Sequence, residues 1–118
     1  MNRIIAGQLA SRRVLTASGL NTRPTTDRVR EAVFSLLGGL IGAVGVDVGR
    51  QLEGLRFLDL YAGSGGVGLE AHSRGAEVTW VDRKADTVRA NLSALGVAGS
   101  VFSMNVERFL RGKVISIQ

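Results

Sequence analysis

Two acids on either side of a glycine-rich turn are the residues best suited to chemistry. Residues 57–68 read FLDLYAGSGGVG, an apolar run leading into Gly63-Ser64-Gly65-Gly66-Val67-Gly68, which fits the pattern G-x-G-x-x-G. Glycines permit a tight turn whose backbone N–H groups approach a ligand, and the positive end of a helix dipole adds to the attraction. Asp82 follows Gly63 by 19 residues, at the end of the next apolar run, where it can hydrogen-bond a ribose diol. The pattern predicts a site for an adenosine-containing ligand.

Asp59 helps to choose between a dinucleotide and S-adenosylmethionine, which present an adenosine to the same kind of crevice. It precedes Gly63 by four residues, where an acid suits a cationic, amine-bearing ligand better than a pyrophosphate. A dinucleotide fold also needs a second mononucleotide-binding half, for which 118 residues leave no room. Two alternatives remain: Asp59 orders the loop through backbone amides, or the turn joins a strand to a helix without a ligand.

The net charge of +5 is concentrated near the N-terminus. Residues 1–30 carry six arginines and one acid, Asp27, whereas the rest of the chain is balanced. A basic segment beside a neutral domain predicts a polyanionic partner, most simply nucleic acid; the alternative is a solvated arginine-rich surface. The chain has no cysteine and one histidine, which argues against a disulfide framework and a zinc site. Without a signal segment or a bilayer-length apolar run, we expect a soluble, cytoplasmic protein that binds no metal.

The hydrophobic pattern predicts the elements that position these residues. Strands are expected at 55–61, 77–82 and 100–104, helices at 66–74, 84–95 and 105–112, and a fourth strand from 113. This alternation predicts an α/β fold, a Rossmann-like parallel sheet with helices on both faces. Upstream we expect a β-hairpin from 3–7 and 12–17 and then a helix capped by Thr25 or Thr26. The predicted organisation is a basic hairpin and helix at 1–37, a glycine-rich connection at 38–54 and a partial cofactor-binding domain at 55–118.

The upstream helix has one apolar stripe at helical spacing. The sequence predicts that this stripe is the buried face, with Arg30 and Phe34 beside it, and that Gly38-Gly39 ends the helix. The stripe consists of Val29, Ala32, Val33, Leu36 and Leu37.

Two stretches, TRPTTDRVREAVFSLL at 22–37 and LDLYAGSGGVGLEAHSRGAEVTWVD at 58–82, together resemble the RsmD-type methyltransferases. These class I enzymes use S-adenosyl-L-methionine to methylate N2 of a guanine in bacterial 16S rRNA. The resemblance runs from the start of the chain to about residue 111. It implies an rRNA (guanine-N2)-methyltransferase with 16S rRNA or a small-subunit precursor as its partner.

The resemblance also implies roles for individual residues. Pro24, Thr25, Thr26 and Arg28 match a motif that closes over the methionine end of the cofactor, and Asn105 stands where the family usually has an aspartate near the adenine amine. The expected cofactor-binding residues are Asp59, Tyr61, Gly63, Ser64, Gly65, Asp82, Arg83, Asn105, Thr25 and Arg28. The expected nucleic-acid contacts are Arg3, Arg12, Arg13, Arg23 and Arg30. His72 and Trp80 are interpreted as structural.

The family's substrate motif, Asn/Asp-Pro-Pro-Tyr/Phe after a fourth strand, has no match here. In that motif, oxygen acceptors orient the exocyclic amine and an aromatic ring stacks on the extruded base. Pro24 is the only proline in the sequence, so no catalytic residue is assigned. The expected explanations are a fragment, a natural truncation or one part of a split enzyme.

A sheet without the family's remaining strands has an exposed edge. We therefore expect marginal stability, or rescue by self-association through that edge or by a second chain. Two other functions remain open: a non-catalytic RNA-binding module that keeps the cofactor fold, and a nicotinamide-binding fragment.

Overall fold

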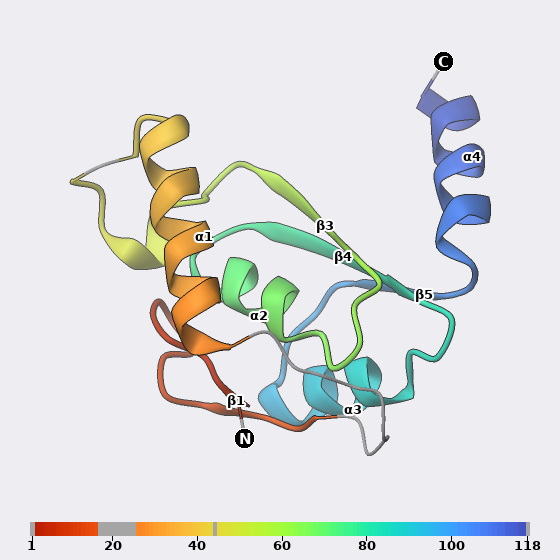
Figure 1. The fold of residues 1–118 in the computed structure, drawn as a ribbon, viewed down its shortest axis with the longest axis horizontal. Helices are drawn as coiled ribbons and strands as arrows, with labels where there is room; N and C mark the ends of the chain where they lie inside the picture. Colours follow the sequence, from red (N-terminus) through yellow and green to blue (C-terminus); the bar gives the residue numbers. More distant parts are fainter. Residues whose placement is uncertain (1, 17–25, 44, 118) are drawn as a thin grey trace.

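A three-stranded parallel sheet forms the centre of the computed structural model, which describes residues 2–16, 26–43 and 45–117 (Figure 1). The strands β3 (Arg56–Leu60), β4 (Glu77–Asp82) and β5 (Ser100–Ser103) are ordered β3-β4-β5. Asp59 lies opposite Trp80, and Trp80 opposite Val101. The helices α2 (Gly66–Ser73) and α3 (Asp86–Leu95) connect successive strands. This arrangement confirms the predicted α/β, Rossmann-like class.

The two faces of the sheet carry different helices. Alternate strand residues such as Phe57, Val78 and Trp80 pack in the main core with α2, α3 and part of α1. Residues of the opposite parity, such as Leu60 and Val81, pack against α4 (Val106–Ile117). Because side chains alternate along a strand, Asp59 shares the face of Trp80, whereas Leu58 points to the opposite face. None of the helices in the described part of the chain is long and apolar enough to cross a membrane.

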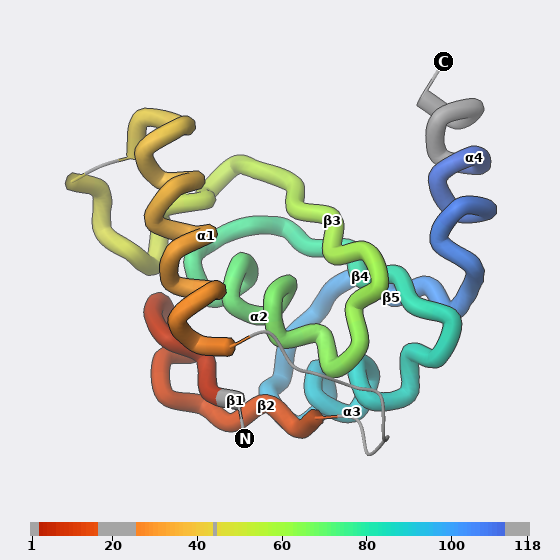
Figure 2. The backbone as a smooth tube through the Cα atoms, in the orientation of Figure 1, coloured from red at the N-terminus to blue at the C-terminus, as the bar shows by residue number. Residues whose placement is uncertain are grey.

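The N-terminal segment forms the predicted hairpin, with shorter strands than expected. β1 (Asn2–Arg3) pairs antiparallel with β2 (Arg13–Val14). Ile4 and Val14 are fully buried in the main core. The hairpin is therefore packed onto the body of the molecule, beneath α1 and at the opposite side from α4 (Figure 2).

Helix α1 (Asp27–Leu40) begins as predicted but ends later. The Thr26 side chain caps it by accepting a hydrogen bond from the backbone N–H of Val29, while Thr25 and Pro24 lie outside the described residues. The prediction that Gly38-Gly39 ends the helix is wrong. Neither glycine has a positive φ, and the left-handed backbone comes later, at Gly42 with φ +73°.

The buried face of α1 also differs from the prediction. Arg30, Phe34 and Gly38 are buried, whereas the stripe residues Val29, Val33 and Leu36 are exposed. Phe34 stacks on Phe57 of β3 at 5.9 Å between ring centroids, and Gly38 lets the side chain of Gln51 approach closely. The apolar pattern identified a helix correctly, but the body of the molecule covers a face about 130° away from the centre of the stripe.

Two further segments complete the fold. The connection at 38–54 contains the last turn of α1 and a short 3-10 helix, η1 (Val48–Arg50), and it buries Leu52. The fourth strand predicted from residue 113 is wrong, because α4 continues to Ile117. Asn105 starts α4 by accepting a hydrogen bond from the backbone N–H of Arg108. A helix already begun adds residues more readily than a new strand without a neighbour forms.

Candidate cofactor site

The glycine turn has the backbone that the sequence pattern requires. Gly63 and Gly65 have φ of +60° and +86°, a left-handed conformation that costs glycine little. A Cβ at Gly63 would meet no atom within 4 Å, so this side of the turn borders open space. Tyr61 also has a positive φ, +54°, which is unusual for a residue with a side chain and marks a locally strained backbone. The outer side of the turn is therefore accessible.

Trp80 supports the inner side of the turn. Its indole Nε1 donates a hydrogen bond to the carbonyl of Gly65 at 3.1 Å, and its side chain is fully buried. A Cβ at Gly68 would lie 2.3 Å from the same nitrogen, so only glycine lets α2 pack this close to β4. The interpretation of Trp80 as a sheet aromatic agrees with this position, and His72 is half-buried on α2 as expected. Burial lowers the pKa of His72.

Asp59 lies beneath the first turn of α2. Its Oδ2 accepts a hydrogen bond from the backbone N–H of Gly68 at 2.8 Å, and the residue is only 8% exposed. Burial raises the pKa of Asp59 to about 6; the Gly68 hydrogen bond opposes this shift and the charge of Asp82 adds to it. The loop-ordering contact named as the alternative is thus present. One oxygen of the carboxylate makes it, and the group retains further acceptor capacity.

Asp82 lies at the end of the neighbouring strand and holds the turn from the other side. Its Oδ2 accepts from the backbone N–H of Gly63 and its Oδ1 from that of Lys84, both at 2.9 Å. In the described part of the chain, neither Asp59 nor Asp82 has an ion-pair partner. The turn is therefore flanked by two carboxylates that form no ion pair with any residue the structure describes.

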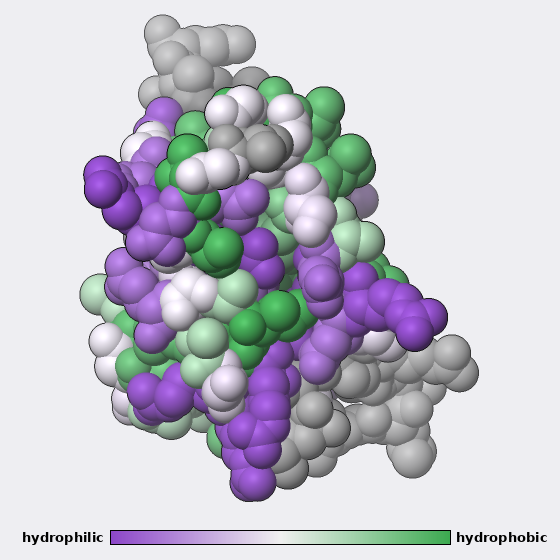
Figure 3. Space-filling model, turned by 90° about the vertical axis from the view of Figure 1, so that its left-hand side faces the viewer, coloured by the Kyte–Doolittle hydropathy of each residue, from purple (hydrophilic) through white to green (hydrophobic). Residues whose placement is uncertain are grey.

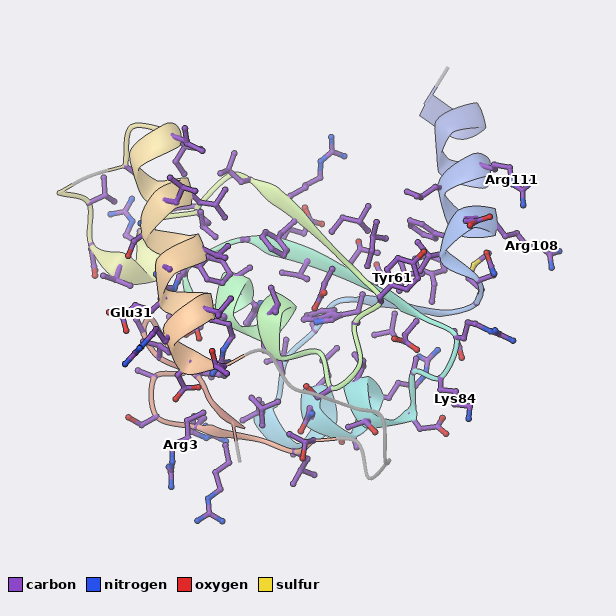
Figure 4. All side chains as sticks on the ribbon, viewed as in Figure 1. Arg3, Glu31, Tyr61, Lys84, Arg108 and Arg111 are labelled. Atoms are coloured by element: carbon purple, nitrogen blue, oxygen red, sulfur yellow. The ribbon has the colours of Figure 1, made fainter. Side chains whose placement is uncertain are left out.

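The other predicted cofactor residues are less tightly grouped. Ser64 lies in the turn, where its Oγ accepts from the backbone N–H of Gly66. Tyr61 is exposed at the carboxyl end of β3, on the side of the molecule that carries α4 (Figure 4). Asn105 follows β5 and uses its amide oxygen to cap α4, and Arg83 follows β4 with its side chain exposed. Arg28 is exposed in the first turn of α1, and Thr25 lies outside the described residues.

Sequence reasoning missed Asn91, which connects the N-terminal hairpin to the glycine turn. It is buried, and its Oδ1 accepts from the backbone N–H of Leu15 while its Nδ2 donates to the carbonyls of Leu15 and Ser64, all at 2.8 Å. Its position in the sequence could have indicated burial, because Asn91 shares a helix face with Val88 and Leu92. A polar residue on a buried face usually has specific hydrogen-bond partners.

Sequence reasoning also missed Glu70, the centre of a buried charge cluster. Its two carboxylate oxygens accept from the backbone N–H groups of Ile5 and Ala6 and from Nε of Arg74. Arg30 Nη1 lies 3.7 Å from Glu70, and Arg30 Nη2 donates to the carbonyl of Arg3 and pairs with Asp27. This cluster joins the hairpin, α1 and α2.

The prediction that Arg30 contacts nucleic acid is wrong, because the residue is only 1% exposed. Its guanidinium is committed to the cluster around Glu70. Arg3, Arg12 and Arg13 have exposed side chains on the hairpin, and Arg23 lies outside the described residues. Arg12 and Arg13 border an open hollow of about 440 Å³ that Ala94 and Leu95 of α3 also line. No group of three or more metal-ligating side chains occurs in residues 2–16, 26–43 and 45–117.

The parallel sheet, the turn between β3 and α2 and the acids at two adjacent strand ends define the Rossmann-like fold used by class I methyltransferases. The chain belongs to the family described as "Conserved hypothetical protein 95", whose model matches residues 2–115, and with it to the RsmD-type rRNA methyltransferases.

Three known proteins illustrate the relationship. The chain is 40% identical to "Putative rRNA methyltransferase YlbH" of Bacillus subtilis, over 92% of this chain and 56% of that protein. It is 38% identical to "Ribosomal RNA small subunit methyltransferase D" of Escherichia coli K12, over 94% of this chain and 53% of that protein. The solved structure of "Putative methyltransferase yhhF" from Escherichia coli matches with a TM-score of 0.73 and 36% identity, over 92% and 56% of the two chains. This chain thus spans about half the length of the curated relatives it matches.

Proposed function

We propose that this chain forms the cofactor-binding half of an S-adenosylmethionine-dependent methyltransferase that acts on N2 of a guanine in 16S rRNA. The observation that carries the proposal is the open glycine turn flanked by Asp59 and Asp82, in a chain whose relatives are named rRNA methyltransferases. Such a substrate would place the protein in the cytoplasm.

The charge of the site favours S-adenosylmethionine over a dinucleotide. A pyrophosphate would place negative charge beside two carboxylates, whereas a ligand with a sulfonium and an ammonium group brings positive charge. The raised pKa of Asp59 is consistent with this choice, because a nearby cation would favour the ionised carboxylate and lower that pKa again. The residues present therefore fit the cofactor, whose sulfonium would supply the methyl group for transfer to an amine.

The proposed roles of the residues follow from their positions. The glycine turn and Asp59 hold the methionine part of the cofactor, Asp82 binds the ribose hydroxyls, and Asn105 lies near the adenine. Tyr61, Ser64 and Arg83 line the same carboxyl edge of the sheet. Thr25 and Arg28 close over the methionine end from the start of α1.

The proposed RNA contacts are the exposed arginines of the hairpin. Arg3, Arg12 and Arg13 are exposed on the hairpin, and Arg12 and Arg13 border the hollow beside α3. Such contacts to phosphates supply affinity that falls steeply with salt. The RNA surface and the cofactor site meet at Asn91, which hydrogen-bonds both Leu15 and Ser64.

No residue of this chain is assigned to the substrate amine. Methyl transfer by in-line displacement depends mainly on positioning the nucleophile, so a chain without that motif is expected to bind the cofactor and to transfer no methyl group alone. A non-catalytic RNA-binding module is the second candidate, favoured by the exposed arginines of the hairpin. Salt-dependent RNA binding without any cofactor binding would support it.

Amide chemical-shift mapping tests the site. Addition of S-adenosylhomocysteine to the isotope-labelled chain is expected to shift the amides of Gly63, Ser64, Gly65 and Asp82 most strongly. The amides of η1, which lies away from the turn, serve as the internal control. Shifts spread evenly over the chain, or centred on the hairpin, would contradict the proposed site.

A further inference from the structure

Asn91 of α3 is the one described residue whose side chain hydrogen-bonds both the N-terminal hairpin and the glycine turn. Its amide exchanges two hydrogen bonds with the backbone of Leu15, one to the N–H and one to the carbonyl, as a neighbouring strand would. The second N–H of the same amide donates to the carbonyl of Ser64. Because Asn91 is only 1% exposed, the loss of any of these bonds would leave a buried polar atom unpaired.

The hairpin end of this connection carries exposed arginines. Arg12 and Arg13 precede Leu15 closely in the chain and line the hollow beside α3 together with it. Hydrophilic side chains project from the lower part of the molecule on the side that carries the hairpin (Figure 3). A phosphate bound by Arg12 and Arg13 would restrain the backbone of this segment. The restraint would reach Leu15, whose N–H and carbonyl are both bonded to Asn91.

The other end of the connection lies at the centre of the glycine turn. Ser64 stands between Gly63 and Gly65, which both have a left-handed backbone. The peptide that contains the Ser64 carbonyl also contains the N–H of Gly65, which donates to the carbonyl of Ala62 at 2.8 Å. The bond from Asn91 holds the carbonyl of that peptide. A planar peptide held at both its N–H and its carbonyl keeps one orientation, which sets the backbone on either side of it.

The other side-chain hydrogen bonds between the hairpin and α2, within the described residues, do not involve the turn. Glu70 accepts from two backbone N–H groups of the hairpin. Ser73 Oγ accepts from the N–H of Leu9 at 2.8 Å and donates to the carbonyl of Ala6 at 2.6 Å. Ser73 is buried and exchanges two hydrogen bonds with the hairpin, as Asn91 does, but it lies at the far end of α2 from the turn. It therefore provides a matched comparison for Asn91.

We propose that Asn91 is a positioning residue that couples RNA binding at the hairpin to cofactor binding at the glycine turn. The identity of the two ligands rests on the proposed function, whereas the coupling rests on the hydrogen bonds of Asn91. Each ligand orders a segment to which Asn91 is bonded, so the ligand that binds second loses less conformational entropy. By linkage, RNA raises the affinity for the cofactor by the same factor as the cofactor raises the affinity for RNA.

Fluorescence anisotropy of a labelled single-stranded RNA oligonucleotide, at one fixed salt concentration, measures the coupling. S-adenosylhomocysteine is the second ligand, because it has no sulfonium and its ammonium and carboxylate charges cancel, so it adds no net charge that attracts phosphates. Saturation with S-adenosylhomocysteine is expected to tighten RNA binding to the 118-residue chain about fivefold. This coupling is expected to be lost in Asn91→Ala and kept in Ser73→Ala.

Hydrogen exchange of the wild-type chain tests the coupling without a substitution that could unfold it. S-adenosylhomocysteine is expected to slow exchange of the Leu15 amide, which donates to Asn91, and to leave exchange of the Leu9 amide, which donates to Ser73, unchanged. Equal slowing of the two amides would indicate a general stabilisation and would overturn the proposal. An RNA affinity that does not change with S-adenosylhomocysteine would also overturn it, as would equal coupling in the two variants.

Failure of this inference is distinguishable from failure of the proposed function. If S-adenosylhomocysteine does not bind the wild-type chain, the cofactor assignment fails, and RNA alone still tests the role of Asn91. RNA is then expected to shift the amide resonance of Gly65 in the wild-type chain and not in Asn91→Ala. An unshifted Gly65 amide, the same shift in Asn91→Ala, or no binding of RNA would overturn the inference.

Discussion

At the residue scale, the candidate site contains a buried acid, Asp59, that has no ion-pair partner among the described residues. Asp59 is held by one backbone hydrogen bond from Gly68 and faces the charge of Asp82, so its ionised form is disfavoured in the folded chain. A buried carboxylate whose pKa is raised by burial and by a second acid is typical of a functional site. Burying the charge of Asp59 lowers the stability of the folded chain, and a bound cationic ligand would offset that charge.

Replacement of Asp59 by Asn is expected to stabilise the chain at neutral pH. The pKa of Asp59 is raised from 3.8 to about 6, so the folded state binds this proton more tightly than the unfolded state. The contribution of Asp59 to the free energy of unfolding is fully present below pH 4 and is lost as the pH rises towards 6. The total loss is about 3 kcal/mol, because each pKa unit corresponds to about 1.4 kcal/mol. Asp59→Asn keeps an oxygen acceptor for the Gly68 N–H and removes the charge.

Urea unfolding of wild type and Asp59→Asn between pH 4 and 8 measures this effect. The stability advantage of the variant is expected to grow from pH 4 to pH 6 and to stay level above that. The same variant is expected to bind S-adenosylhomocysteine more weakly, because the ammonium group loses its counter-charge. A stability difference that does not change with pH would contradict the assigned burial of this charge.

The sequence identified Asp59, Asp82 and the glycines because backbone geometry and strand order alone bring them together. It did not identify Arg30, Glu70 or Asn91. Their burial depends on contacts of the hairpin with α1, α2 and α3, and the contacting residues are separated by up to 76 positions in the chain. An arginine in a basic segment has the same local pattern whether it is solvated or buried beside a carboxylate.

At the element scale, the position of the turn depends on how closely α2 packs against β4. Replacement of Gly68 by Ala would place a Cβ 2.3 Å from Trp80 Nε1 and 3.0 Å from Asp59 Oδ2, so the helix must move or the indole must turn. We expect a loss of about 1–3 kcal/mol in the free energy of unfolding, the usual cost of overpacking. We also expect weaker cofactor binding, since Trp80 holds Gly65.

Gly39→Ala is the matched control for this change. Gly39 is also within a helix, but a Cβ there would meet no atom within 4 Å. Because alanine restricts the unfolded chain and favours the helix, this variant is expected to gain about 0.5–1 kcal/mol. Equal effects of the two substitutions, measured by urea unfolding, would show that helix propensity rather than packing governs α2.

The type of each secondary-structure element was easier to predict than the contacts that the element makes. Hydrophobic periodicity alone predicts the strand at 77–82 and the helix face of Ala85, Val88 and Leu92, and both agree with the structure. The buried face of α1 does not follow from hydrophobic periodicity. Its apolar residues span a wide arc of the helix, and the face that becomes buried depends on the segments that pack against it. The helix at 113–117 was missed because β-branched residues favour a strand locally, whereas α4 was already formed.

At the scale of the whole molecule, the chain combines a fully formed glycine turn with an edge of β3 that no strand of the described residues pairs. The relatives continue for about as much chain again, and the resemblance assigns the substrate-amine motif to a part that has no match here. Under the proposed function, the reaction is divided between two sets of residues. The residues of this chain would bind the cofactor and RNA, and those of the part that it does not span would orient the amine.

Calorimetric titration of the 118-residue chain with S-adenosylhomocysteine, with NAD as the control ligand, tests the central claim most directly. The account predicts saturable one-to-one binding of S-adenosylhomocysteine, weakened by Asp82→Ala, and no binding of NAD. Binding of NAD in preference, or no binding of either ligand by a chain shown to be folded, would contradict the assignment of the glycine turn as a methyltransferase cofactor site.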